Sequence, residues 1–313
     1  MHKKFYGFFS AFLLALLTFS CSQQPIFWAI AQEIKLLDPS VKGNVHTIVR
    51  CANDLYTANG NIYRKPLATE RGWKQISKPA GNAVYLAASD THLYAMSATG
   101  KECQVYAMNV PGGEWQPVPG TSGKADEIVL FDNKLTSAPD SAAYVKVKGT
   151  VHLLDHATLG ADQTPNGAGA DTVAALGSKS APLFFNTRAV CNGGAGNTYR
   201  ADGKKVINIS NGVEVSTSEE VTCLAFDSTN LRLIAGTKRG LEEIILDSSG
   251  DPQSTALLGA NAEAAFGESE IFSLACFGIF DNDAIYAGVG KKGSSNHNAL
   301  WGYYPSRGNW NYE

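Results

Sequence analysis

From Asn44 to its last residue, the chain alternates short apolar runs with turn-forming residues, and one arrangement of runs returns several times. Each copy has an apolar run, an Asn- or Asp-containing turn, a Leu-Tyr or Ile-Tyr pair, a glycine-rich turn, a second run with Tyr, and Gly-x-Trp or Gly-x-x-Trp. The pair appears as Leu55-Tyr56, again as Leu93-Tyr94, and finally as Ile285-Tyr286. Strand-sized runs between turn residues, with no long amphipathic helical stretch, predict an all-β fold.

The repeat spacing narrows this prediction. A period of roughly 40 residues with about four strands per unit is typical of β-propeller blades. We expect a β-propeller of six blades, with seven as the alternative and one or two β-sandwiches as a different architecture. The first strand of each predicted blade lies near Val45, Val84, Ile128, Val173, Val221 and Ile271.

The fourth unit is the hardest to divide into strands. The runs TVAAL, PLFFNT, NTYRAD and KVINIS can fill its four places in that order. Asn192-Gly193-Gly194 and Asp202-Gly203 are hairpin turns of the kind that need positive backbone φ. In the fifth unit the outer strand is expected beyond Asp251-Pro252.

The start of the chain carries a different pattern. His2-Lys3-Lys4 is basic, Phe5 to Phe19 is apolar, and Ser20 precedes Cys21. Such a short apolar segment with these flanks predicts an export signal rather than a membrane-spanning helix. We therefore divide the chain into a cleaved signal peptide (1–20), a tether and ring-closing segment (21–43), and the propeller domain (44–313).

The sequence Leu17-Thr18-Phe19-Ser20-Cys21 resembles the lipobox of bacterial lipoproteins. Most lipoboxes have Leu three residues before the cysteine, where this chain has Thr18, and relaxed boxes of this kind are similar to those of spirochaetal lipoproteins. The resemblance implies that Cys21 becomes the first mature residue and carries acyl chains, which together would anchor a soluble body stably. The resemblance thus implies that segment 21–43 begins with the lipid anchor. The alternative is an ordinary secretory signal cut near Ser20.

Charge and composition limit the partners. With 44% hydrophobic and 18% charged residues, the chain has enough apolar side chains for a globular core. The formal net charge is −3, and loss of Lys3 and Lys4 with the signal makes it more negative. This argues against nucleic acid as a partner, because binding phosphates needs a concentrated basic surface.

Five cysteines remain after Cys21. An odd number cannot all pair, which argues against a disulfide framework and favours buried free thiols. One disulfide between Cys103 and Cys191, placed in turn regions, stays open. The five are Cys51, Cys103, Cys191, Cys223 and Cys276.

Candidate chemistry is sparse. His152 and His156, with Asp155 between them, could share one face of a strand, but a metal site needs a third or fourth convergent ligand. Ser210-Asn211-Gly212 and Asp247 to Asp251 are expected to form turns. No nucleophile-elbow, zinc-protease, phosphate-loop or C-x-x-C motif is present. We assign no catalytic, cofactor-binding or metal residues and expect the protein not to be an enzyme.

Trp73, Trp115 and Trp310 each follow a glycine-containing turn into a predicted outer strand. The position is similar to that of the Asp-box in sialidase-like propellers, whose own motif is absent here. We expect the indoles to pack one blade against the next, with sugar stacking as the alternative. Five acids flank predicted inner strands and could face a central channel; the alternative is that they only keep the strand ends in contact with water. They are Glu127, Glu219, Glu220, Glu268 and Glu270.

Taken together, these features predict a lipid-anchored envelope protein that acts as a non-catalytic protein-binding or scaffold module. The expected partners are the membrane, through lipid at Cys21, and an envelope or host protein. Propeller lipoproteins that serve as scaffolds in outer-membrane assembly show what such a resemblance implies. The alternatives are a glycan-binding or glycan-hydrolysing propeller and an outward-facing host adhesin.

Overall fold

The computed structural model describes residues 40–69, 72–125, 127–132, 142–162, 190–193, 197–258, 269–279, 282–291, 294–304 and 308–313. These residues belong to one compact unit, Pro39–Glu313. Within the described ranges they form twenty-four strands in six four-stranded antiparallel sheets and no helix. The described part of the chain therefore has no helix that could span a membrane.

Each sheet is a meander of four consecutive strands. Sheet 1 contains β1 (Thr47–Cys51), β2 (Asp54–Ala58), β3 (Ile62–Pro66) and β4 (Lys74–Ile76). Sheet 2 contains β5 (Asn82–Ala88), β6 (His92–Thr99), β7 (Glu102–Asn109) and β8 (Gln116–Lys124). Sheet 3 contains β9 (Ile128–Asp132), β10 (Ala143–Val147), β11 (Thr150–Asp155) and β12 (Thr158–Asp162).

The second half of the chain repeats this plan. Sheet 4 contains β13 (Val190–Asn192), β14 (Thr198–Asp202), β15 (Lys205–Asn208) and β16 (Glu214–Ser216). Sheet 5 contains β17 (Val221–Asp227), β18 (Arg232–Thr237), β19 (Gly240–Leu246) and β20 (Pro252–Leu257). Sheet 6 contains β21 (Glu270–Ile279), β22 (Asn282–Lys291), β23 (Ser294–Tyr304) and β24 (Asn309–Tyr312).

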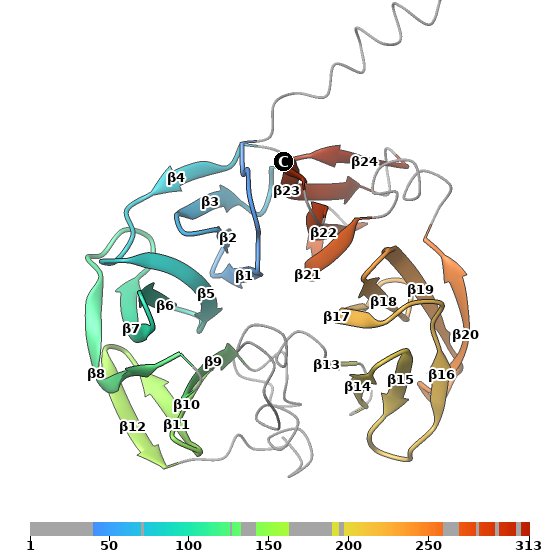
Figure 1. Cartoon of the computed structure of the whole chain (residues 1–313), viewed down its shortest axis with the longest axis horizontal. Coiled ribbons are helices and arrows are strands. Elements are labelled where there is room, and N and C mark those ends of the chain that lie inside the picture. The colour runs from blue at the N-terminus through green and yellow to red at the C-terminus, as the bar shows by residue number, and fades with distance from the viewer. Residues whose placement is uncertain are drawn as a thin grey trace, which may run out of the picture. The chain divides into compact units, whose positions relative to one another are not determined.

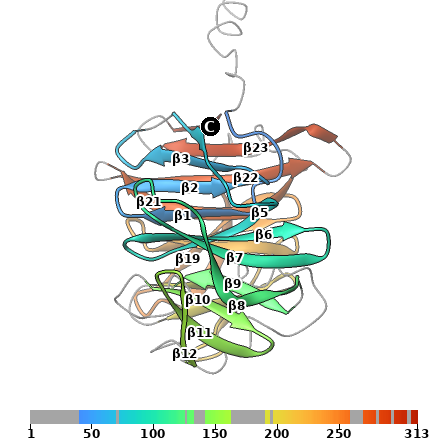
Figure 2. The same ribbon diagram turned by 90° about the vertical axis from the view of Figure 1, so that its left-hand side faces the viewer.

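Figure 1 shows the six sheets around a common centre, with the first strand of each sheet innermost and the fourth outermost. Seen from the side in Figure 2, neighbouring sheets stack face against face. β1 contacts both β5 of the next sheet and β21 of the last sheet, which brings the first and last sheets together. This architecture is consistent with the predicted six-bladed propeller and differs from a two-layer sandwich.

Burial falls from the second strand of a sheet to the fourth. The strands β2 and β6 are buried along almost their whole length, because each sheet is covered on both faces. After their first residues, Asp54 and His92, they consist of apolar, aromatic and small residues and lack the apolar–polar alternation of a half-exposed strand. In β4 and β16 no residue is fully buried. Outer strands thus carry little hydrophobic signal.

This gradient explains an error in the sequence prediction. The run NTYRAD forms the second strand of sheet 4 and KVINIS the third, not the third and fourth, and the first strand is Val190–Asn192 rather than a run near Val173. The mostly exposed β16 has no apolar run to mark it. The sequence prediction therefore omits this fourth strand and assigns the second and third strands to the third and fourth places. TVAAL and PLFFNT lie outside the described residues.

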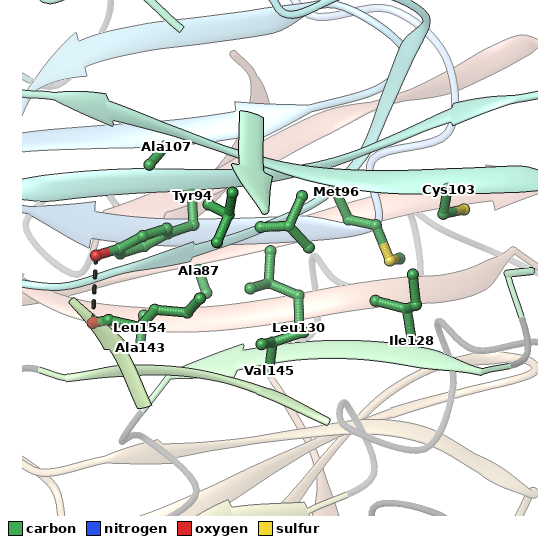
Figure 3. Packing of buried hydrophobic residues seen from close by; sticks show 12 residues of the cluster. Ala87, Tyr94, Met96, Cys103, Ala107, Ile128, Leu130, Ala143, Val145 and Leu154 are labelled. Carbon is green, nitrogen blue, oxygen red and sulfur yellow. Dashed lines mark hydrogen bonds between the residues drawn. The ribbon is translucent and has the colours of Figure 1, made fainter. Parts of the chain in front are cut away.

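The cores lie between sheets, as the contact of sheets 2 and 3 illustrates (Figure 3). Met96 of β6 packs with Ile128 and Leu130 of β9. Tyr94 reaches across the same interface, where its hydroxyl donates a hydrogen bond to the carbonyl oxygen of Leu154 at 3.4 Å. Sheet-to-sheet packing of this kind removes apolar surface on both faces of every sheet from water.

Residues 40–43 continue the outer edge of sheet 6 next to β24. The amide of Ser40 donates to the carbonyl of Glu313 at 2.7 Å, and the amide of Leu300 donates to the carbonyl of Val41 at 3.1 Å. A Cβ on Gly288 of β22 would lie 2.2 Å from the carbonyl oxygen of Val45, so the chain passes very close to the last sheet. The described end of the predicted ring-closing segment therefore joins first and last sheets, whereas Ile26 to Leu37 lies outside the described residues.

Candidate functional site

The meander topology sorts the turns into two sets. Successive antiparallel strands reverse direction, so turns after the first and third strands of a sheet lie at one edge, and turns after the second strand lie at the opposite edge. We call the first edge rim A and the second rim B. Turns on the rims are where a rigid scaffold of this type presents functional side chains.

Rim A of sheets 4 and 5 carries the large hydrophobic side chains that are exposed among the described residues. Val213 is in the turn between β15 and β16, Leu231 is in the turn between β17 and β18, and Ile245 lies one residue before the end of β19. Their exposed fractions are 36%, 65% and 47%. Single exposed apolar residues need no explanation, but three on one rim of two adjacent sheets favour an interaction surface.

Leu231 stands in a turn held by charged side chains. Its φ of 50° lies in the left-handed region, which is unusual for a bulky residue. The Asp227 carboxylate accepts hydrogen bonds from the Asn230 amide nitrogen at 3.2 Å and from Arg232 Nε at 2.7 Å. Arg232 Nη1 also donates to Glu243 at 2.9 Å, which ties the turn to β19. The apolar side chain is therefore presented from a fixed backbone.

Sheets 4 and 5 are joined at the same rim. Asp251 Oδ1 accepts hydrogen bonds from Asn208 Nδ2 at 2.8 Å and from Asn211 Nδ2 at 2.7 Å. Gly250 has a φ of 82°, and a Cβ there would lie 2.2 Å from Asn197 Nδ2. These contacts hold the turn that bears Val213 against the turn after β19.

Both polar turns predicted in this region are confirmed. Asp247 Oδ1 accepts the amide hydrogens of Ser249 and Asp251, at 2.8 and 2.9 Å. In the other turn, Asn211 Oδ1 accepts the amide hydrogen of Val213 at 3.0 Å. The side chains satisfy their own backbone, as expected for turn residues.

The two predicted histidines of sheet 3 are not brought together. His152 Nδ1 lies 3.3 Å from the carbonyl oxygen of Gly160, on the neighbouring strand β12. His156 lies instead beside His92 of sheet 2, with 4.5 Å between ring centroids. In the described ranges no three His, Cys, Asp or Glu residues group in a way that could hold a metal ion.

Among the predicted carboxylates that the structure describes, Glu127, Glu219 and Glu220 precede inner strands at rim B, and Glu270 is the first residue of one. Glu219 lies 3.5 Å from Lys204 Nζ, and Glu220 pairs with Lys238. Glu127 and Glu270 are partly exposed, and Glu268 lies outside the described residues. Glu219 and Glu220 therefore form ion pairs with lysines that lie in turns between second and third strands.

The tryptophans mainly pack sheets together, as predicted. Trp73 is 5% exposed, and its ring contacts Tyr286 of sheet 6 edge-on at 6.2 Å. Trp310 is 5% exposed and joins the core shared with Ile234 of sheet 5. Trp115 is only half-buried, and its Nε1 donates to the carbonyl of Ser77 at 3.0 Å. Of the three, Trp115 alone is not fully buried.

No disulfide joins any of the five cysteines of the propeller. The predicted burial is confirmed for Cys51 and Cys223, whereas Cys276 is only half-buried. Cys103 and Cys191 lie in strands β7 and β13, not in turns, and do not pair. Burial raises the pKa of both thiols. A disulfide between them is therefore excluded by their placement in separate cores.

Residues 8–246 match the model of the TP013X lipoprotein family. The chain belongs to this family. The match begins within the apolar leader, includes Cys21 and extends into β19. The protein is thus a membrane-associated envelope lipoprotein, in agreement with the coarser part of the sequence prediction.

No curated protein matches this chain significantly. Among solved structures, a chain from the crystal structure of a nidogen/laminin complex is similar, with 14% identity and a TM-score of 0.42. The similarity covers 82% of this chain and 90% of that chain. A likeness of this size supports no conclusion about ligands.

Sequence reasoning missed the exposed residues of rim A. Leu231 and Ile245 lie in runs that read as ordinary strands, LRLIAGT and GLEEIIL, and their solvent exposure depends on where each strand ends. One signal in the sequence could have indicated Leu231. It lies between Asn230 and Arg232, directly after a predicted strand, where a turn must separate that strand from the next.

Proposed function

We propose that this lipoprotein is a non-catalytic protein-binding module, anchored through lipid on Cys21, which uses rim A of sheets 4 and 5 to hold a protein partner. The observation that carries the proposal is the placement of Val213, Leu231 and Ile245 on one rim with a fixed backbone. Binding through an ordered surface avoids the cost of ordering loops at the moment of association.

The surroundings of these residues suit a protein surface. Protein interfaces combine apolar anchors with a polar rim that excludes water. Here the apolar side chains stand beside Asn211, Asp247 and the Arg232–Glu243 pair, whose polar atoms are partly solvent-exposed. A small-molecule site would instead bury most of its ligand in a concave cavity.

An enzymatic role has less support. Catalysis on glycans uses two carboxylates at a controlled separation, and among the acids singled out from sequence Glu219 and Glu220 face lysines. A lectin role would rest on Trp115, the one half-exposed tryptophan of the three. Whether the partner belongs to the envelope, as for a scaffold, or to a host, as for an adhesin, is an outcome of the test.

The test compares binding by the lipidated protein and two matched variants. Leu231→Asn removes the apolar side chain but keeps a residue type that tolerates positive φ. Lys148→Asn places the same residue type at an exposed turn position of rim B, where Lys148 has a φ of 49°, and removes no apolar side chain. Cross-linking on intact envelope tests for an envelope partner. Binding to immobilised host matrix proteins tests for a host partner.

The proposal expects one partner to be recovered by wild type and by Lys148→Asn, and recovered at least about tenfold less by Leu231→Asn. Equal recovery by all variants would overturn the assignment to rim A. Turnover in a panel of glycosidase substrates, abolished by replacing one carboxylate, would overturn the non-catalytic proposal.

A further inference from the structure

A pair of histidines joins rim A of sheets 2 and 3, away from the exposed residues of sheets 4 and 5. His92 is the first residue of β6, and His156 directly follows β11. Their ring centroids are 4.5 Å apart, and the ring planes are inclined by 69°. His92 is buried, whereas the His156 side chain is 71% exposed, so the pair is reachable from solvent on one side.

Each imidazole has its Nδ1 engaged by a neighbouring oxygen. His156 Nδ1 lies 2.5 Å from Asp155 Oδ1, and His92 Nδ1 lies 2.8 Å from Thr91 Oγ1. A carboxylate accepts a hydrogen bond from Nδ1–H, which leaves the lone pair on Nε2. The carboxylate–histidine arrangement is also the one that orients and strengthens metal-ligating imidazoles in proteins.

From this geometry we propose that His92 and His156 together bind one divalent cation of the zinc, nickel or copper class through their Nε2 atoms. Metal–nitrogen bonds of about 2.0–2.1 Å place two imidazole centroids on one ion roughly 4.5 to 5.2 Å apart. The observed separation falls at the short end of that range. Imidazole ligands suit these metals, whereas calcium and magnesium prefer oxygen.

The site differs from the one that the sequence suggested. The expected partner of His156 was His152, four residues earlier, but His152 faces Gly160 within its own sheet. Only the stacking of sheets brings His92 to His156. Asp155 is engaged by Nδ1 of His156, and the described residues contain no group of three His, Cys, Asp or Glu that could hold a metal ion. His92 and His156 are therefore the two protein ligands, and water supplies the third and fourth ligands that a metal site needs.

Titration of the purified full-length lipoprotein in detergent with zinc chloride and nickel chloride tests the proposal by calorimetry. Wild type should bind one ion per chain. His156→Ala should weaken binding at least tenfold without loss of fold, since the replaced side chain is mostly exposed. Asp155→Asn should weaken binding by about 10- to 100-fold, as the orienting carboxylate is lost. The matched control His152→Ala should bind like wild type.

His92→Gln gives an independent check, because it removes the other ligand from sheet 2. The readout is the rise in thermal midpoint that the metal causes, which can be measured even if His92→Gln lowers the midpoint without metal. We expect the metal to raise the midpoint of wild type and to leave that of His92→Gln unchanged. Absence of binding by wild type, or binding that survives His156→Ala, overturns the proposal. Loss of binding in His152→Ala with retention in His156→Ala would place the ion elsewhere in sheet 3 and also overturn it.

Discussion

The ammonium of Lys65 in sheet 1 lies 3.5 Å from Glu313 Oε2, the residue that follows β24 of sheet 6, and neither side chain has exposed surface. Lys65 Nζ also donates to the hydroxyls of Tyr286 and Tyr304, at 2.5 and 3.1 Å. It stands 4.5 Å from the centre of the Tyr286 ring. The first and last sheets are thus joined by a buried ion pair inside an aromatic cage.

Lys65→Met should lower the free energy of unfolding by about 3 to 5 kcal/mol, since it leaves the Glu313 carboxylate buried without its cation. The double variant Lys65→Met/Glu313→Leu should recover much of this loss, because no buried charge remains. Urea unfolding followed by circular dichroism measures both.

Lys205→Met is the matched control. It breaks the ion pair between Lys205 and Glu214, whose side chains are 50% and 46% exposed. Exposed pairs contribute little to stability, because water screens the two charges. A loss for Lys65→Met no larger than that for Lys205→Met would contradict a stabilising role of the buried pair.

The same pair predicts a pH dependence. Burial raises the pKa of the Glu313 carboxyl above its ordinary value, although Lys65 and the hydrogen bonds from Tyr304 and Trp73 oppose the shift. The folded state therefore holds a proton more tightly than the unfolded state. The contribution of this group is complete below the unfolded pKa and is lost as pH rises through the folded pKa.

We expect wild type to become more stable relative to Glu313→Gln as pH falls from neutral toward the unfolded pKa of Glu. The free energy of unfolding of wild type minus that of the variant should therefore increase over this interval. Urea titrations of both proteins across that interval measure it, and other carboxyls cancel in the difference. A difference that is flat, or that moves toward the variant, contradicts the direction of the shift.

The sequence predicted the fold much better than the site. The repeat was visible because the inner strands are covered on both faces and therefore read as apolar runs, as in VTCLAF of β17. The assignment of strands failed in sheet 4, where β16 is mostly exposed and has no apolar run that would mark it as a strand.

The closing contact could not be predicted. Lys65 sits in IYRKP beside Arg64, and nothing in the local pattern distinguishes the buried cation from its half-exposed neighbour. Its burial depends on Tyr286, Tyr304 and Glu313, more than 200 residues away in sequence. The pairing of His92 with His156 likewise depends on how two sheets stack, which no spacing within one unit encodes.

Trp73→Ala should cost about 3 to 5 kcal/mol, since the ring is 5% exposed and packs between sheets 1 and 6. Trp115→Ala should cost less, below about 2 kcal/mol, because the residue is only half-buried and so removes less apolar surface from water. Thermal or urea unfolding compares them. Equal losses would show that Trp115 is as deeply packed as Trp73, and a negligible loss for Trp73 would contradict its role between sheets.

The propeller thiols should resist alkylation in the native state. Burial, with smaller contributions from Asp90 and Asp54, raises the pKa of Cys51 to about 12, and burial also raises the pKa of Cys191. Because the thiolate is the reactive form, iodoacetamide at mildly alkaline pH should leave both unmodified until urea unfolds the protein. Cys276, which is half-buried, should react first. Mass spectrometry of digested samples locates the label, and early modification of Cys191 would contradict its placement.

Cys21 should decide membrane attachment. In a lipoprotein, acyl chains on this cysteine hold the body at the membrane, each buried methylene contributing about 0.8 kcal/mol. Wild type should enter the detergent phase on phase partitioning and incorporate labelled palmitate, whereas Cys21→Ala should remain aqueous and unlabelled. Cys276→Ala, which changes a propeller cysteine, should behave like wild type. If wild type and Cys21→Ala both stay aqueous, the signal is an ordinary secretory one, and the anchor assigned to Cys21 is wrong.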